Sequence, residues 1–162
     1  MKRLKLLNSG PPGSLKTRMA LSFPDKFYID LEGGADWYAD EFGLVEGTNW
    51  LKTTDPDTVM EQIDWLLTNR HTFRTVIIDS GTAYYTGLQI KYSDIFHEYE
   101  KRSAGNKPDY YKIQPSDWTI IKREGNRLVQ KLLMLDMNVI MTAQEKSQYA
   151  EGTVMSPTGL KI

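Results

Sequence analysis

The stretch GPPGSLKT, residues 10–17, constrains the fold of this chain more than any other feature. A short apolar run at residues 4–8 precedes it, and a segment compatible with a helix, residues 16–23, follows it up to Pro24. A strand, a tight glycine turn and a helix N-terminus together direct backbone N–H groups toward phosphate oxygens. This order predicts a phosphate-binding loop.

The loop departs from the usual pattern G-x-x-x-x-G-K-[ST], because Leu15 stands where the last glycine belongs. Lys16 is predicted to reach the β- and γ-phosphates and Thr17 to bind Mg²⁺. If the backbone at Leu15 is helical, its side chain points away, and we expect altered affinity rather than lost binding. The competing interpretation is a surface turn that happens to carry a lysine. The predicted nucleotide contacts are Gly10, Pro11, Pro12, Gly13, Ser14, Leu15, Lys16, Thr17 and Arg18.

Strand and helix patterns alternate along the rest of the chain. Strands are predicted at residues 26–31, 74–80 and 137–143, and helices at 56–69, 84–100 and 116–135. Asp55 or Thr54 is expected to cap the first of these helices and Ser116 the last. Their predicted buried faces are Val59, Ile63, Leu66 and Leu67, and Trp118, Ile121, Leu128, Leu132 and Leu135. The alternation predicts a single α/β domain, residues 1–162, with a mostly parallel sheet flanked by helices.

The composition of the chain limits the kinds of partner and site that it can have. The net charge of −1 gives no overall attraction to nucleic acid or membranes, so any such binding must come from a local patch. The chain has no cysteine, which excludes disulfides and thiolate metal sites and fits a reducing cytoplasm. It has no run of about 18 apolar residues, and no cleavage site follows its basic start. We therefore expect a cytoplasmic protein that neither spans nor binds a membrane.

Two carboxylates complete the predicted site. Asp79 ends the apolar run TVIID, the position of a metal-binding aspartate in phosphate-loop proteins, although it could merely cap the next turn. Ser80 follows it instead of glutamate, so a general base must come from elsewhere. Glu32 is the candidate, because carboxyl ends of parallel strands line the ligand crevice. The alternative for Glu32 is a solvated turn carboxylate.

Four stretches, GPPGSLKT, YIDLEGGADWYADEFGL, TVIIDS and NVIMTAQEK, resemble the RecA-like recombination ATPases in order and spacing. They look closest to the small RecA-like single-strand-annealing ATPases of bacteriophages, over residues 3–146. The resemblance implies binding of ATP and Mg²⁺, slow hydrolysis, and coupling to single-stranded DNA. It implies that Lys16 binds phosphate, Glu32 activates water, and Thr17 and Asp79 hold the metal. Gln144 would sense the γ-phosphate and link it to a DNA-binding loop.

The resemblance also implies an aromatic residue against the adenine. Tyr38 falls near that position, and Trp37 fits equally well. Core packing is the alternative for both rings.

Two segments fall where RecA-like proteins contact DNA. The first, residues 101–112, is predicted to be a loop whose cations follow phosphates and whose rings stack on bases, unless it is simply a solvated loop. Its candidates are Lys101, Arg102, Lys107, Tyr110, Tyr111 and Lys112. The second, residues 145–158, contains Lys146, which by resemblance would reach a neighbouring subunit's nucleotide and so implies a homo-oligomer.

The strands that follow the second DNA loop in the family are missing from this chain. The resemblance therefore predicts a RecA-like sheet truncated at its C-terminus. Three alternatives stay open: a small nucleotide kinase, a viral motor ATPase, and a non-hydrolysing DNA-binding assembly protein with a vestigial ATP site. The kinase is disfavoured because Arg102 and Arg123 do not cluster as a phosphate lid would.

Overall fold

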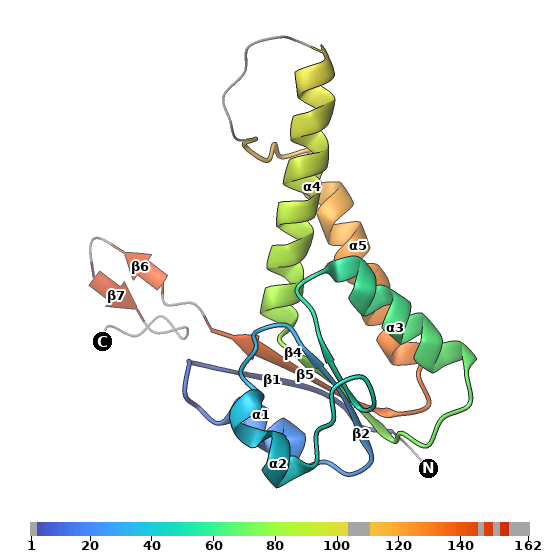
Figure 1. Cartoon of the computed structure of the whole chain (residues 1–162). Coiled ribbons are helices and arrows are strands. Elements are labelled where there is room, and N and C mark those ends of the chain that lie inside the picture. The colour runs from blue at the N-terminus through green and yellow to red at the C-terminus, as the bar shows by residue number, and fades with distance from the viewer. Residues whose placement is uncertain (1–2, 104–110, 146–147, 151–152, 156–162) are drawn as a thin grey trace.

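A five-stranded, all-parallel sheet forms the centre of the fold (Figure 1). The computed structural model describes residues 3–103, 111–145, 148–150 and 153–155. The strands lie in the order β1-β5-β4-β2-β3. Their bounds are β1 (Lys5–Gly10), β2 (Lys26–Asp30), β3 (Trp50–Lys52), β4 (Thr75–Asp79) and β5 (Asn138–Gln144). A separate antiparallel pair is formed by β6 (Gln148–Ala150) and β7 (Thr153–Met155).

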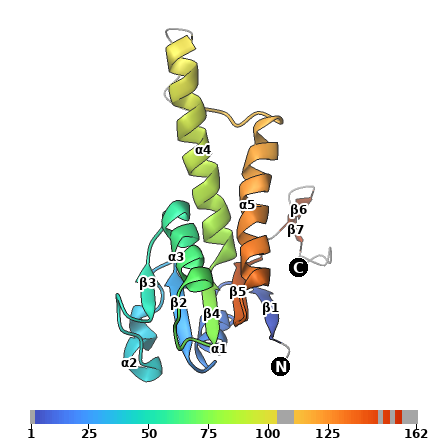
Figure 2. The same ribbon diagram turned by 90° about the vertical axis from the view of Figure 1, so that its right-hand side faces the viewer.

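Helices cover both faces of the sheet (Figures 1 and 2). One face carries α3 (Pro56–Thr68), α4 (Gly81–Ser103) and α5 (Asp117–Met134), and the other carries α1 (Lys16–Leu21), η1 (Asp36–Tyr38) and α2 (Ala39–Phe42). Successive strand residues point to opposite faces, so Ile29 lies in the core under α3–α5 and Tyr28 in the core on the α1 side. The predicted α/β fold with a parallel sheet flanked by helices is confirmed.

The predicted helix faces pack as expected. Val59, Ile63 and Leu66 are buried and Leu67 packs against them; Ile121, Leu128, Leu132 and Leu135 are buried beside a partly exposed Trp118. None of the helices in the described ranges combines the length and the apolar character that crossing a bilayer requires.

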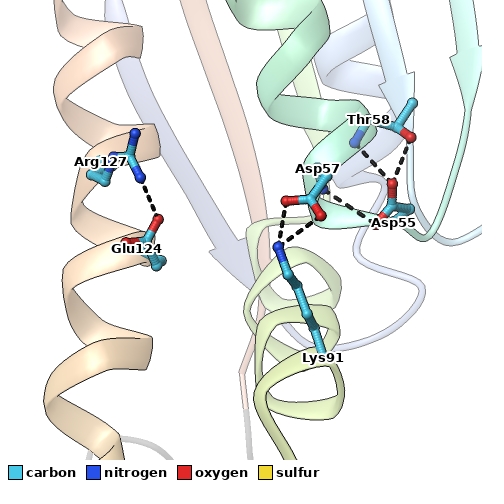
Figure 3. Close-up of polar contacts among 6 residues, drawn as sticks. All are labelled: Asp55, Asp57, Thr58, Lys91, Glu124 and Arg127. Carbon is cyan, nitrogen blue, oxygen red and sulfur yellow. Dashed lines mark hydrogen bonds and ion pairs between the residues drawn. The ribbon is translucent and has the colours of Figure 1, made fainter. Parts of the chain in front are cut away.

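The predicted N-cap residues occupy the starts of α3 and α5, but only the first makes a side-chain capping bond. The carboxylate of Asp55 accepts N–H groups from Asp57 and Thr58, which confirms it as the cap of α3 (Figure 3). Ser116 occupies the N-cap position of α5, as predicted, but its hydroxyl makes no capping hydrogen bond. The Asp117 carboxylate instead accepts the N–H of Gln114, which precedes the helix, at 2.7 Å.

Helix α4 is longer than predicted, and this changes the expected loop. It begins at Gly81 and continues to Ser103 rather than covering residues 84–100. Lys101 and Arg102 therefore lie on its last turn and not in a loop, a correction to the sequence prediction. Lys91 of α4 pairs with Asp57 at the start of α3, while Arg127 pairs with Glu124 along α5 (Figure 3).

Candidate nucleotide-binding site

The loop between β1 and α1 contains two residues with left-handed backbone. Gly13 has φ +78°, and Leu15 has φ 59° and ψ 23°. The condition considered for Leu15, a helical backbone, is not met, because Leu15 adopts the left-handed conformation that favours glycine. Leu15 is 62% exposed and also borders the cavity next to the loop.

Lys16 lies within the curve of the loop. Its Nζ donates to the carbonyl oxygens of Gly10 at 3.0 Å and Pro11 at 2.8 Å, and to Ser14 Oγ at 3.3 Å. A Cβ atom at Gly10 would lie only 2.8 Å from Ser14 Oγ, so the loop closes tightly over this glycine. The ammonium group therefore lies inside the loop, against its oxygen atoms.

Asp79 gathers three hydroxyl groups at the end of β4. Thr17 Oγ1 donates to its Oδ2 at 2.6 Å, the Tyr28 hydroxyl donates to the same oxygen at 2.8 Å, and Thr142 donates to Oδ1. Tyr28 and Asp79 are both buried. The burial of the Tyr28 phenol and the negative charge of Asp79 beside it raise the pKa of Tyr28 far above its ordinary value, so the phenol keeps its proton and stays a hydrogen-bond donor. The structure joins Thr17 to Asp79, as the sequence predicted. The positions of Tyr28 and Thr142 were not predicted.

The oxygen pair of Thr17 and Asp79 fits Mg²⁺. This ion prefers oxygen ligands and commonly takes one or two from the protein, with water and phosphate oxygens completing its shell. No group of three or more acidic, His or Cys side chains suited to a metal occurs among the described residues. Magnesium at this position would therefore depend on the nucleotide's phosphates.

A turn after β2 presents Glu32 to the loop. The buried carboxylate of Asp30 accepts N–H groups from Glu32 at 3.1 Å, Gly33 at 2.7 Å and Ala35 at 3.3 Å. Gly33 has φ +72°, which a side chain would disfavour. Asp30 was not predicted, although a carboxylate that follows a buried strand and precedes two glycines is a turn signal.

Glu32 is held by two residues from neighbouring strand ends. The Ser80 hydroxyl donates to its Oε1, and Gln144 Nε2 lies 3.1 Å from both carboxylate oxygens. The structure therefore brings together Glu32, Asp79 and Gln144, which are far apart in sequence. Glu32 and Gln144 also border a second cavity of about 760 Å³, so Glu32 is accessible from two sides.

A cavity of about 280 Å³ lies between the loop and these strand ends. Its lining consists of Pro12, Gly13, Ser14, Leu15, Lys16, Thr17, Arg18, Glu32, Gly34, Tyr38, Asp79, Ser80 and Gln144. Tyr38 borders it and also packs edge-on against Phe42, whereas Trp37 is 92% exposed and packs in no core. Arg18 borders the cavity while its guanidinium pairs with Glu41 at 2.7 Å.

The predicted DNA contacts are only partly described. Lys107, Tyr110 and Lys146 lie outside the described residues. Lys112 is exposed. Tyr111 packs 5.7 Å from the Phe96 ring and donates to Asp117 at 2.7 Å, contacts that tie the start of α5 to α4.

Comparison with known proteins agrees with this geometry. The sequence profile of the AAA domain family matches residues 2–161, nearly the whole chain. A search of curated proteins finds no match.

Proposed function

This chain belongs to the AAA domain family of P-loop NTPases, and we propose that it uses ATP hydrolysis to control its binding to single-stranded DNA. Membership implies binding and hydrolysis of ATP, typically with Mg²⁺. The proposal adds the DNA partner and a role in phage-type recombination or annealing, possibilities that come from the sequence resemblance.

One observation supports the proposal of ATP hydrolysis: a single cavity is lined by the phosphate loop, by the Thr17–Asp79 pair and by Glu32. Lys16 supplies positive charge beside the β- and γ-phosphates, where charge develops in phosphoryl transfer. Bound Mg²⁺ adds further positive charge there. Asp79, through its hydrogen bond, keeps the Thr17 hydroxyl at the metal position.

Glu32 is the group suited to orient the attacking water. Glu32 borders the same cavity as the loop, and Gln144 and Ser80 hold its carboxylate. A carboxylate held in this way accepts a hydrogen bond from water and aligns it for in-line attack on the γ-phosphate.

The arrangement of α4 supports the DNA role. The helix begins beside the candidate site and ends at Lys101 and Arg102, two of the predicted DNA contacts. The net charge of −1 requires such cations to be concentrated locally if the protein is to bind a polyanion.

Steady-state ATP turnover with and without single-stranded DNA tests the proposal, using wild type, Glu32→Ala and Leu15→Gly. We expect slow turnover that DNA stimulates, and a fall of about 100-fold or more in kcat for Glu32→Ala with ATP affinity retained. No turnover in either wild type or Leu15→Gly would contradict hydrolysis.

Two further arms separate the alternatives. Stimulation by a nucleoside monophosphate instead of DNA would identify a kinase. DNA binding that persists in Lys16→Ala and without ATP would identify an assembly protein with a vestigial nucleotide site.

A further inference from the structure

Ser80 makes three hydrogen bonds that link the turn after β2 to the start of α4. Its hydroxyl donates to Glu32 Oε1 and accepts the N–H of Ala83 at 3.1 Å. Its carbonyl oxygen accepts the N–H of Tyr84 at 3.0 Å, so Ser80 occupies the N-cap position of α4. Ser80 is 1% exposed, whereas its partner Glu32 is exposed at the cavity.

The first turn of α4 reaches Glu32 by a second route. Thr82 Oγ1 accepts the backbone N–H of Gln144 at 2.9 Å, and Gln144 Nε2 in turn donates to Glu32. Both residues that hold the Glu32 carboxylate are thus bonded to the first turn of α4, Ser80 through its hydroxyl and Gln144 through its backbone N–H. The carboxylate direction is therefore tied to the placement of this helix.

We propose that Ser80 is a positioning residue for Glu32, whose hydroxyl couples the start of α4 to the carboxylate that orients the attacking water. This inference rests on the proposed ATP hydrolysis. Helix α4 has 23 residues and so extends about 35 Å, which carries it well beyond the sheet (Figure 1). A displacement of the helix changes the geometry of Glu32 through Ser80, without any contact between its far end and the nucleotide.

Ser80→Ala and Ser80→Thr form the test pair, because threonine keeps the hydroxyl and the capping function. We expect Ser80→Ala to lower kcat about tenfold, the typical effect of losing one such hydrogen bond, with ATP affinity unchanged within about twofold. Ser80→Thr restores most of the rate. In a Glu32→Gln background Ser80→Ala has no further effect, because it acts through Glu32.

Asp55→Ala is the matched control, since it removes the N-cap of α3 without touching Glu32. A capping role alone predicts that both cap variants lower kcat similarly, and that Ser80→Ala has equal effects with Glu32 and with Gln at that position. Either result would overturn the inference.

Hydrogen exchange gives a readout that does not need turnover. We expect amide exchange across residues 31–35 to accelerate in Ser80→Ala and not in Asp55→Ala. Absent turnover in both the wild type and Leu15→Gly would refute the proposed function, whereas unchanged exchange at these amides would refute the Ser80 contact itself.

Discussion

Leu15 adopts a backbone conformation that costs a residue with a side chain about 1–2 kcal/mol and costs glycine almost nothing. Its exposed side chain contributes little burial in return. Glycine also loses more entropy on folding, by about 0.4–1 kcal/mol, which offsets part of the gain. We therefore expect Leu15→Gly to raise the free energy of unfolding by up to about 1 kcal/mol, measured by urea denaturation.

Leu15→Val is the opposing variant, because a β-branched residue tolerates the left-handed region least. It should lower the free energy of unfolding by about 1 kcal/mol. A valine variant as stable as the wild type would show that position 15 does not hold this conformation in solution.

Tyr38 and Trp37 give a second test at single residues. Stacking of a base on an aromatic ring contributes about 1–3 kcal/mol, and Tyr38 alone of the two borders the cavity. Tyr38→Ala should weaken ATP binding about tenfold by isothermal titration calorimetry, while Trp37→Ala leaves it unchanged. If Trp37→Ala weakened ATP binding and Tyr38→Ala did not, the adenine would lie against Trp37.

Residue type and spacing were enough to predict the groups expected to face the nucleotide, but not those that hold them. Tyr28 and Thr142 lie within apolar strands, where their pattern reads as core. A hydroxyl in such a strand needs a buried partner, and that requirement is the signal that was overlooked. Which partner it finds depends on strand order, which the sequence does not display.

Among the helices, the N-cap of α3 links stability to pH. Hydrogen bonds from the Thr58 hydroxyl and backbone hold the pKa of Asp55 below its ordinary value of 3.8. A carboxylate with a lowered pKa in the folded state stabilises it above the ordinary pKa, and this contribution is lost as pH falls through the folded value. Asp55→Ala should lower the free energy of unfolding by about 1 kcal/mol at pH 7, and its difference from the wild type should shrink as the pH falls below 3.8.

Asp55→Asn separates charge from geometry, since asparagine caps helices without titrating in this range. Its stability should exceed that of Asp55→Ala by an amount that does not change with pH. Thermal or urea unfolding from pH 3 to 7 measures both differences. A pH-independent gap between the wild type and Asp55→Ala would contradict the lowered pKa.

Two helix glycines differ in what surrounds them. A Cβ at Gly125 in α5 would meet the Tyr85 ring at 3.6 Å, an ordinary contact, so Gly125→Ala should stabilise the helix by about 1 kcal/mol. A Cβ at Gly87 in α4 would lie 3.0 Å from Pro56 Cγ and 3.1 Å from the Thr54 carbonyl oxygen. Gly87→Ala should therefore show no such gain in urea unfolding, and an equal gain would mean that α3 and α4 separate easily.

Element length decides which elements a sequence pattern predicts. Helices α3 and α5 were recognised because several turns repeat their apolar spacing, and β4 because it is apolar on both faces. Strand β3 has three residues at the sheet edge, too few to show a period, and was missed.

At the scale of the whole molecule, strand order brings the site together. Strand β5 lies between β1 and β4, so Gln144 ends beside Gly10 while β2 places Asp30 beside Asp79. The sequence predicts strands and their common direction, but it contains no local signal for this order. The convergence of Glu32 and Gln144 followed from the resemblance and the general rule for strand ends, not from the pattern of residues.

Three cationic residues of the predicted DNA-contacting segment lie near the far end of α4, away from the sheet. Lys101 and Arg102 at the end of α4, and the exposed Lys112, belong to the predicted DNA-contacting segment. Each phosphate neutralised on a single strand contributes about 0.7 to the slope of log K against log salt. The triple alanine variant of these residues should weaken single-stranded DNA binding and reduce that slope by about 2, measured by fluorescence anisotropy between 50 and 300 mM salt.

A matched triple variant tests whether DNA binding depends on where the three cations lie or only on the total charge of the protein. Arg3, Arg70 and Arg74 border a cavity at the amino ends of the strands, opposite the candidate nucleotide site. Replacing all three with alanine removes the same formal charge, and long-range attraction is screened beyond about 10 Å at 0.1 M salt. We expect this variant to keep the wild-type salt slope, and both variants to keep their ATP affinity without DNA. Equal loss of DNA binding in the two would show that attraction is general to the surface, and the segment at the end of α4 would lose its assigned role.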